Sequence, residues 1–166
     1  MRLLLFFFII ISSAVYSIEQ PYVISKEQQC MALNIYHESR SENMAGRYAV
    51  ADVVLNRVYD TRYPDNVCDV IYQGKHKPSW KDPNELVPIR NQCQFSWYCD
   101  GLSDEPTDND AWNDSVLIAI QILENDKHRG LTEGATHYHA TFVNPFWAER
   151  LQLIGHIGSH IFYRAE

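Results

Sequence analysis

Residues 43–58, NMAGRYAVADVVLNRV, would be apolar around nearly the whole circumference of a helix. A helix of this kind has to be buried among other elements, so we expect it to lie at the centre of the fold. Two glutamates, Glu38 and Glu42, come just before it. Burial of an ionisable group is costly, so this placement indicates either structural pairing or a role in chemistry.

Length and charge limit what the chain can be. Its 166 residues suffice for one domain with a real hydrophobic core. The net charge of −7 argues against nucleic acid and anionic membrane surfaces as partners. Aromatic residues make up 13% of the chain, which fits either a groove that stacks on sugars or a well-packed core.

Residues 1–17 have the order of a secretory signal peptide, with one basic residue, an apolar run and then small and polar residues. Val15 and Ser17 suit the small-residue positions of a cleavage site. The apolar run is too short for a comfortable transmembrane helix, and an anchor that is released later is the alternative. Cleavage would remove Arg2 and no acid. We therefore expect a mature chain of residues 18–166 that is secreted or periplasmic, monomeric, and not stably membrane-associated.

The cysteine content fits an exported protein. The four cysteines are Cys30, Cys68, Cys93 and Cys99. They allow three complete pairings, among which the sequence does not choose. Pairing of the last two would close a tight loop. Their spacing matches no zinc site, so structural disulfides are expected.

The order of local patterns predicts a mainly helical α+β fold with a small antiparallel sheet. Helices are expected at 25–39 with Ser25 as N-cap, at 43–58, at 64–72 opening at Pro64, at 108–124, and briefly at 145–152. Strands are expected at 135–143 and 159–164, paired with each other. Residues 74–102 have no clear period and predict a long surface excursion with a small hairpin.

Glu38 and Glu42 would share a face if the first helix continued that far. Two carboxylates on one face cannot flank a glycosidic bond from opposite sides, as a two-carboxylate glycosidase requires. If Glu38 is catalytic, Glu42 is therefore its neighbour, capping the next helix or pairing with Arg40 or Arg47. The plainer alternative for Glu38 is an ion pair with an arginine.

Two further clusters have candidate chemistry. His137 and His139 would share one face of a strand, with Tyr138 on the other. They are either hydrogen-bonding groups or a metal pair that still needs a third ligand, for which His160, Glu38 and Asp100 are candidates. In QFSW, an extended chain would place Gln94 and Ser96 on one side, opposite two aromatic side chains.

Five ordered blocks resemble the SleB-like cell wall hydrolases, the catalytic domains related to spore cortex-lytic enzymes. The blocks are IYHESRSENMAGRYAVADVVLNRV, VCDVIYQ, CQFSWYCDG, GATHYHA and IGSHIFYR, between about Cys30 and Arg164. The resemblance implies a single lysozyme-like domain that cleaves peptidoglycan with one essential glutamate. The family block Y-x-E-[AS]-R-x-E corresponds to residues 36–42, so that glutamate is Glu38. His37 stands where a small residue is usual, which affects the expected rate more than the expected reaction.

The implied reaction is cleavage of peptidoglycan glycan strands between N-acetylmuramic acid and N-acetylglucosamine. Glu38 would be the acid, with a pKa raised by burial. With no opposite carboxylate evident, attack by the muramoyl 6-hydroxyl would give a 1,6-anhydro product, as in a lytic transglycosylase. No cofactor is expected, and a bacterial wall enzyme and a phage endolysin are both compatible. The candidate substrate-binding residues are Tyr36, Gln94, Ser96, Thr136, Tyr138, His139 and Tyr163.

Two rival functions stay open. One is a metal-dependent amidase or peptidase that uses His137 and His139 on the peptide stems. The other is a wall-binding protein without activity, against which the complete glutamate block argues.

Overall fold

The computed structural model describes residues 22–166. The predicted signal segment, residues 1–17, lies outside the described residues. Within residues 22–166, the helices are all too short or too polar to cross a membrane.

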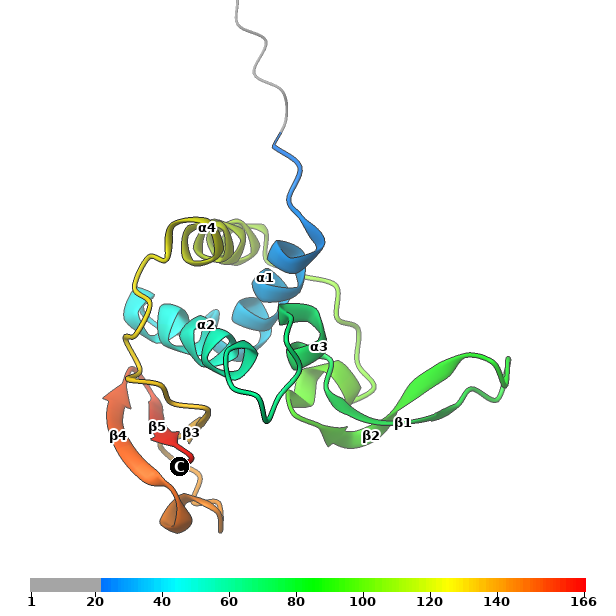
Figure 1. Ribbon diagram of the computed structural model, residues 1–166. Coiled ribbons are helices and arrows are strands. Elements are labelled where there is room, and N and C mark those ends of the chain that lie inside the picture. Colours follow the sequence, from blue (N-terminus) through cyan, green and yellow to red (C-terminus); the bar gives the residue numbers. More distant parts are fainter. Residues whose placement is uncertain (1–21) are drawn as a thin grey trace, which may run out of the picture.

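Three longer helices make up the body of the molecule: α1 (Lys26–Ser39), α2 (Met44–Val58) and α4 (Asn109–Asn125). Figure 1 shows α2 between α4 and the C-terminal strands, with α1 beside it. Ten residues of α2 are buried, including Val50, Val53 and Val54 with no exposed surface. This confirms that the all-round apolar pattern marks the central helix.

Each long helix begins at a polar cap, as its sequence indicates. The Ser25 side chain accepts from the backbone of Gln28, whose side chain accepts from Ser25 in return, so the predicted cap is a full capping box. Asn43 caps α2, and Asp108 caps α4. These side chains satisfy amides that the helix itself leaves without partners.

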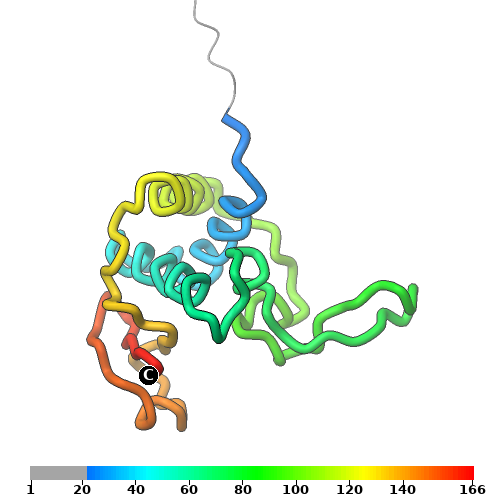
Figure 2. Tube along the Cα trace, viewed as in Figure 1, coloured from blue at the N-terminus to red at the C-terminus, as the bar shows by residue number. Residues whose placement is uncertain are grey.

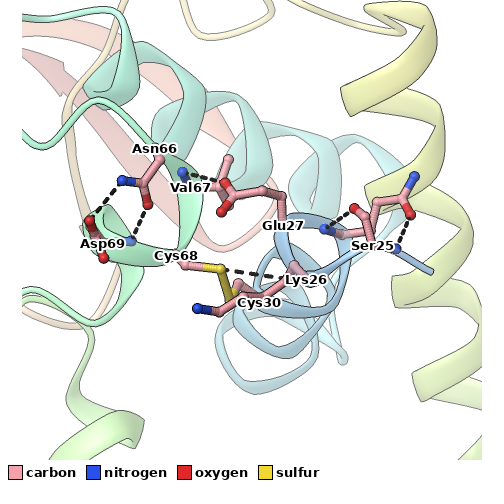
Figure 3. The surroundings of a disulfide bond; sticks show 9 residues. Ser25, Lys26, Glu27, Cys30, Asn66, Val67, Cys68 and Asp69 are labelled. Carbon is pink, nitrogen blue, oxygen red and sulfur yellow. Dashed lines mark hydrogen bonds between the residues drawn. A yellow bond between two sulfur atoms is a disulfide. The ribbon is translucent and has the colours of Figure 1, made fainter.

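The short helix α3 (Val67–Ile71) begins later than predicted. Asn66, not Pro64, precedes its first turn, and the Asn66 side chain accepts from the amide of Asp69. The capping hydrogen bond therefore fixes the start of this helix. Figure 3 shows the disulfide Cys30–Cys68, which ties α3 to α1.

A long hairpin leaves the body after α3, and Figure 1 shows it projecting away from the helices. It consists of β1 (Gly74–Pro78) and β2 (Leu86–Cys93), paired antiparallel, and confirms the predicted excursion. A 3-10 turn, η1 (Ser96–Cys99), follows, and the second disulfide, Cys93–Cys99, closes it against the base of the hairpin. Residues 94–97 are therefore not an extended strand.

The second sheet has the order β3-β5-β4, with β3 (His137–Ala140), β4 (Gln152–Ile157) and β5 (His160–Arg164). The predicted pairing of the first and last of these segments is confirmed, with Tyr138 opposite Phe162. Figure 2 traces the chain into this sheet at its C-terminal end. One sheet face packs on α2, where Phe162 lies with Ala49, Val53 and Ala135.

The segment between β3 and β5 differs from its prediction. The first strand ends at Ala140, three residues earlier than expected, in a turn where the Val143 amide donates to the Ala140 carbonyl. The helix predicted at 145–152 is only a 3-10 turn, η2 (Ala148–Arg150). The chain then enters β4, an edge strand that the sequence analysis missed.

Candidate active site

Glu38 lies in the last turn of α1, where the buried helix meets the surface. Its side chain is partly buried, and the Tyr138 hydroxyl donates to Glu38 Oε2 at 2.9 Å. Tyr138 comes from β3, a hundred residues further along the chain. The carboxyl group is thus held by one neutral donor and has no ion pair among residues 22–166.

Burial raises the pKa of the Glu38 carboxyl. The hydrogen bond from Tyr138 and the positive charge of Arg57 act in the opposite direction but do not cancel the effect of burial. A carboxyl group with a raised pKa keeps its proton closer to neutral pH, as a general acid requires. Burial, together with the charge of Glu38, also raises the pKa of Tyr138 well above its ordinary value, so its hydroxyl stays a donor.

Two hollows meet at Glu38. The larger, of about 480 Å³, has an aromatic and acidic wall that includes Trp97, Asp100 and Asp104. The smaller, of about 160 Å³, is lined by Glu38, Arg57, Cys93, Gln94, Phe95, Ser96 and Tyr138. Ser96 lines both hollows. Asp100 and Asp104 line the same hollow as Glu38, so further carboxylates lie at the site, which the sequence alone did not place there.

His37 packs into the wall of the larger hollow. Its ring stacks on Trp97 with centroids 4.7 Å apart, and its Nε2 lies 3.1 Å from the carbonyl oxygen of Asp104. Burial raises the pKa of Asp104, with a counteracting contribution from His37. The residue that departs from the family block therefore links α1 to the loop that covers this hollow.

Three of the predicted substrate-binding residues lie at the hollows with Glu38: Gln94, Ser96 and Tyr138. Although QFSW is not extended, Gln94 and Ser96 are exposed while Phe95 and Trp97 are buried. Tyr36 also lines the larger hollow. Its hydroxyl accepts from the amides of Thr107 and Asp108, so it also holds the loop before α4.

The other three predicted residues are not brought to Glu38. His139 and Tyr163 stack on the face of the sheet opposite Tyr138, around Trp147. Thr136 is buried, and its hydroxyl lies 3.0 Å from His137 Nδ1. The alternation along β3 explains the separation of His139 and of Tyr163, which pairs with His137, because Tyr138 faces Glu38 and its neighbours point the other way.

Glu42 is engaged in hydrogen bonds that connect two parts of the fold. Because α1 ends at Ser39, Glu42 does not share a helical face with Glu38. Its carboxylate accepts from both the amide and the hydroxyl of Ser159, in the turn between β4 and β5. It pairs with neither Arg40 nor Arg47, although the side chain of Arg47 donates to its backbone carbonyl.

The histidines of β3 are already engaged with protein groups. His139 Nδ1 lies 2.9 Å from the Ala140 carbonyl oxygen, and its Nε2 lies 3.1 Å from the Tyr163 hydroxyl. Within residues 22–166, His, Cys, Asp and Glu side chains nowhere gather in a group of three that could hold a metal ion. The metal-dependent alternative needs a third ligand. The candidates for it, His160, Glu38 and Asp100, do not complete such a group.

Arg57, which lines the smaller hollow with Glu38, was not among the predicted site residues. Its one sequence signal is that it is a basic residue in the last turn of α2. Such a residue ordinarily indicates a favourable interaction with the helix terminus, so the sequence alone does not connect it with the site.

Comparison with known proteins bears on what this site does. A family model described as Cell Wall Hydrolase matches residues 41–163, beginning just after Glu38. Spore cortex-lytic enzymes from Halalkalibacterium halodurans and Oceanobacillus iheyensis are 47% identical over 45 residues and 36% identical over 63 residues. These matches cover 27% and 34% of this chain but only 14% and 23% of the relatives.

Two solved structures are similar over most of the chain. The catalytic domain of the germination-specific lytic transglycosylase SleB from Bacillus anthracis is 28% identical, with a TM-score of 0.58. The match covers 87% of this chain and all of that domain. The catalytic domain of Bacillus cereus SleB is 27% identical, with a TM-score of 0.57, and the match covers 91% of this chain and all of that domain.

Proposed function

Because this chain belongs to the cell wall hydrolase family, we propose that it cleaves peptidoglycan glycan strands between N-acetylmuramic acid and N-acetylglucosamine, with Glu38 as the acid. The observation that carries the proposal is the environment of Glu38. A partly buried carboxyl group with a raised pKa stands where two hollows meet, oriented by one neutral donor, Tyr138.

The proposed reaction needs one carboxyl group in two steps. Glu38 gives its proton to the glycosidic oxygen as the bond from that oxygen to the muramoyl C1 breaks. The 6-hydroxyl of the same muramoyl residue then forms a bond to C1, and its proton returns to Glu38. The products are a 1,6-anhydromuramoyl end and a free 4-hydroxyl. Similarity to the catalytic domain of a lytic transglycosylase supports this course over hydrolysis.

Substrate contacts are assigned to Gln94, Ser96 and Tyr138, which line the smaller hollow. Tyr36 acts from the wall of the larger one. His139 and Tyr163 support β3 from its other side, and through β3 they position Tyr138. Thr136 supports the site through its backbone carbonyl, which accepts from Arg57 Nε.

The compartment follows from the substrate. We propose that residues 1–17 are removed on export and that residues 18–166 act as a monomer outside the cytoplasm, where peptidoglycan lies. Two disulfides among residues 22–166 suit an oxidising environment.

The test is Glu38→Gln, assayed on purified sacculi with mass spectrometry of the muropeptides. We expect activity to fall by at least about 10²- to 10⁴-fold, the usual contribution of general acid catalysis, with an unchanged melting temperature or a higher one. The wild-type products should carry anhydro ends. Wild-type activity in the folded variant would refute the role of Glu38. Products that have gained a water would refute transglycosylation and direct attention to Asp100 and Asp104.

A further inference from the structure

Arg57 is a buried cation without a matching anion. It lies near the end of α2 with 5% of its surface exposed, and it makes no ion pair with a carboxylate among residues 22–166. Its Nε donates to the Thr136 carbonyl at 2.8 Å. The rings of Tyr63 and Phe95 lie 5.4 and 5.2 Å from the guanidinium carbon.

One nitrogen of this side chain, Nη1, is buried and has no hydrogen-bond partner. A buried donor without an acceptor is unfavourable, and for a charged group the penalty is larger than for a neutral one. Native proteins retain such groups mainly where they have a function or where a missing molecule completes them.

Arg57 lines the smaller hollow together with Glu38, Tyr138, Gln94 and Ser96. At about 160 Å³ the hollow equals the share of liquid volume of about five waters. It is therefore too small for a whole N-acetylated sugar and large enough for a substituent of one. A guanidinium donates only, so the substituent must present an acceptor oxygen.

Peptidoglycan sugars carry hydroxyls, which both donate and accept, and two substituents with a carbonyl oxygen, which only accepts: the N-acetyl group and the lactyl group of the muramoyl residue. The N-acetyl group of the muramoyl residue is on C2, next to the C1 at which the bond breaks, and Glu38, the proposed acid at that bond, lines the hollow. The lactyl group is one carbon further away, and in the wall it continues into the stem peptide, so it is the bulkier of the two.

We propose that the smaller hollow is a subsite for an N-acetyl group of the bound glycan, with Arg57 Nη1 donating to the acetyl carbonyl oxygen. This inference rests on the proposed function, because it names the part of the same substrate that the hollow receives. In this arrangement, Arg57 holds the sugar ring in place beside the Glu38 carboxyl.

The test is a thermodynamic cycle that changes the Arg57 side chain and the acetyl group of the ligand, singly and together. Binding is measured in the Glu38→Gln background, so that turnover does not interfere. Glu38→Gln and Glu38→Gln/Arg57→Lys are titrated with a soluble four-sugar glycan, with its N-deacetylated form, and with an N-acetylglucosamine tetramer that lacks lactyl groups. The titrations are run at a pH above the pKa of the freed amines, so that deacetylation adds no positive charge beside position 57. Lysine keeps the positive charge but loses the guanidinium geometry. Melting temperatures check that both proteins are folded.

With Arg57 present, deacetylation should weaken binding by roughly 10- to 100-fold, the usual effect of a hydrogen bond to a charged group. With lysine, the acetylated glycan should already bind weakly, and deacetylation should add no more than about twofold. Loss of the lactyl groups should affect both proteins equally. If Arg57→Lys does not fold, Ser96→Leu, which fills the hollow from its mouth, should show the same loss of sensitivity to the acetyl group.

Equal deacetylation effects in both proteins would overturn the subsite. A cycle that couples Arg57 to the lactyl group instead would overturn the N-acetyl assignment. Both outcomes leave the proposed function intact, because wild-type cleavage of sacculi tests it separately. A wild-type protein that cleaves no glycan would refute the proposed function itself.

Discussion

The protonation of Glu38 is a balance between burial and two neighbours. Burial raises its pKa, while the Tyr138 hydroxyl and the Arg57 charge lower it. Tyr138→Phe removes the hydroxyl but keeps the ring that packs near Phe162. The carboxylate then loses a stabilising donor, so the pKa of Glu38 rises further.

Because a general acid is active while it holds its proton, this change should move the alkaline limb of the pH profile to higher pH. The measurement is the rate of sacculus lysis against pH. Tyr48→Phe is the matched control, because the Tyr48 hydroxyl bonds to Gln121 in the packing of α2 against α4. An alkaline limb that shifts to lower pH in the Tyr138 variant would contradict the assigned role of the hydroxyl.

Glu42 should behave as a structural residue. Burial tends to raise its pKa, but donation from Ser159 and the nearby His160 outweigh this, and the net pKa is lowered. A lowered pKa contributes stability that is present above the ordinary glutamate pKa and is lost as pH falls through the folded-state value. Glu42→Gln should therefore lower the melting temperature at neutral pH, and the difference from wild type should shrink in acid.

The loss of activity in Glu42→Gln should be much smaller than in Glu38→Gln. The two variants are compared on the same sacculi at one temperature below both melting transitions. A larger loss of activity in Glu42→Gln than in Glu38→Gln would show that Glu42, and not Glu38, is the catalytic acid.

At the residue scale, some residues of the candidate site could be predicted from the sequence and others could not. Glu38 could be predicted because it occupies a fixed place in a block that also carries its helix. Arg57 could not, because its importance depends on Glu38, Tyr138 and Gln94, which come from three other segments. For His139 and Tyr163, alternation in a strand predicts which residues share a face, but not which face meets the site.

At the scale of elements, the starts of the three long helices were predictable because each has a capping side chain before a clear helical pattern, whereas the short helix α3, although capped by Asn66, starts later than predicted. Ser25, Asn43 and Asp108 each accept from the first turn of the helix that follows. The strand β4 was missed because its pairing with β5 shifts register between Leu153 and Gly155, which breaks the alternating pattern. Asn144 and Pro145 are typical of the start of a helix, so the sequence predicts a helix at 145–152. The strand β4 forms instead because these residues pair with β5 from Gln152 onward.

The two disulfides tie elements together over very different distances. Cys30–Cys68 spans 38 residues and joins α1 to α3, as Figure 3 shows, whereas Cys93–Cys99 spans 6. In the chain-entropy relation, the longer loop contributes about 4 kcal/mol and the shorter about 2 kcal/mol to the free energy of unfolding.

Replacement of both Cys30 and Cys68 by alanine should therefore destabilise the protein more than the same change at Cys93 and Cys99. Urea unfolding measures the two free energies, and thiol titration of the denatured, unreduced protein should find no free thiol. Four free thiols would contradict both disulfides, and equal losses of stability would contradict the loop-length argument.

At the scale of the whole molecule, the site exists only because distant segments converge. The end of α1, the end of α2, the turn η1 and the strand β3 all contribute to the smaller hollow. The class of fold was predictable from periodicity and capping. The convergence was not, because it depends on how the β3-β5-β4 sheet and the hairpin base pack against the helices.

The same convergence separates the proposed glycan-cleaving site from the histidines that a metal mechanism would need. Tyr138 faces Glu38, while His137 and His139 lie on the other face of the sheet around Trp147. Both nitrogens of His139 already face protein oxygens, and a catalytic zinc site needs three protein ligands. Exhaustive dialysis against a chelator should therefore leave the rate and the anhydro products unchanged. His139→Ala should slow turnover modestly, by loosening the support of β3, and leave the products the same. Activity that disappears on chelation and returns in proportion to bound zinc would show instead that the chemistry runs through a metal centre.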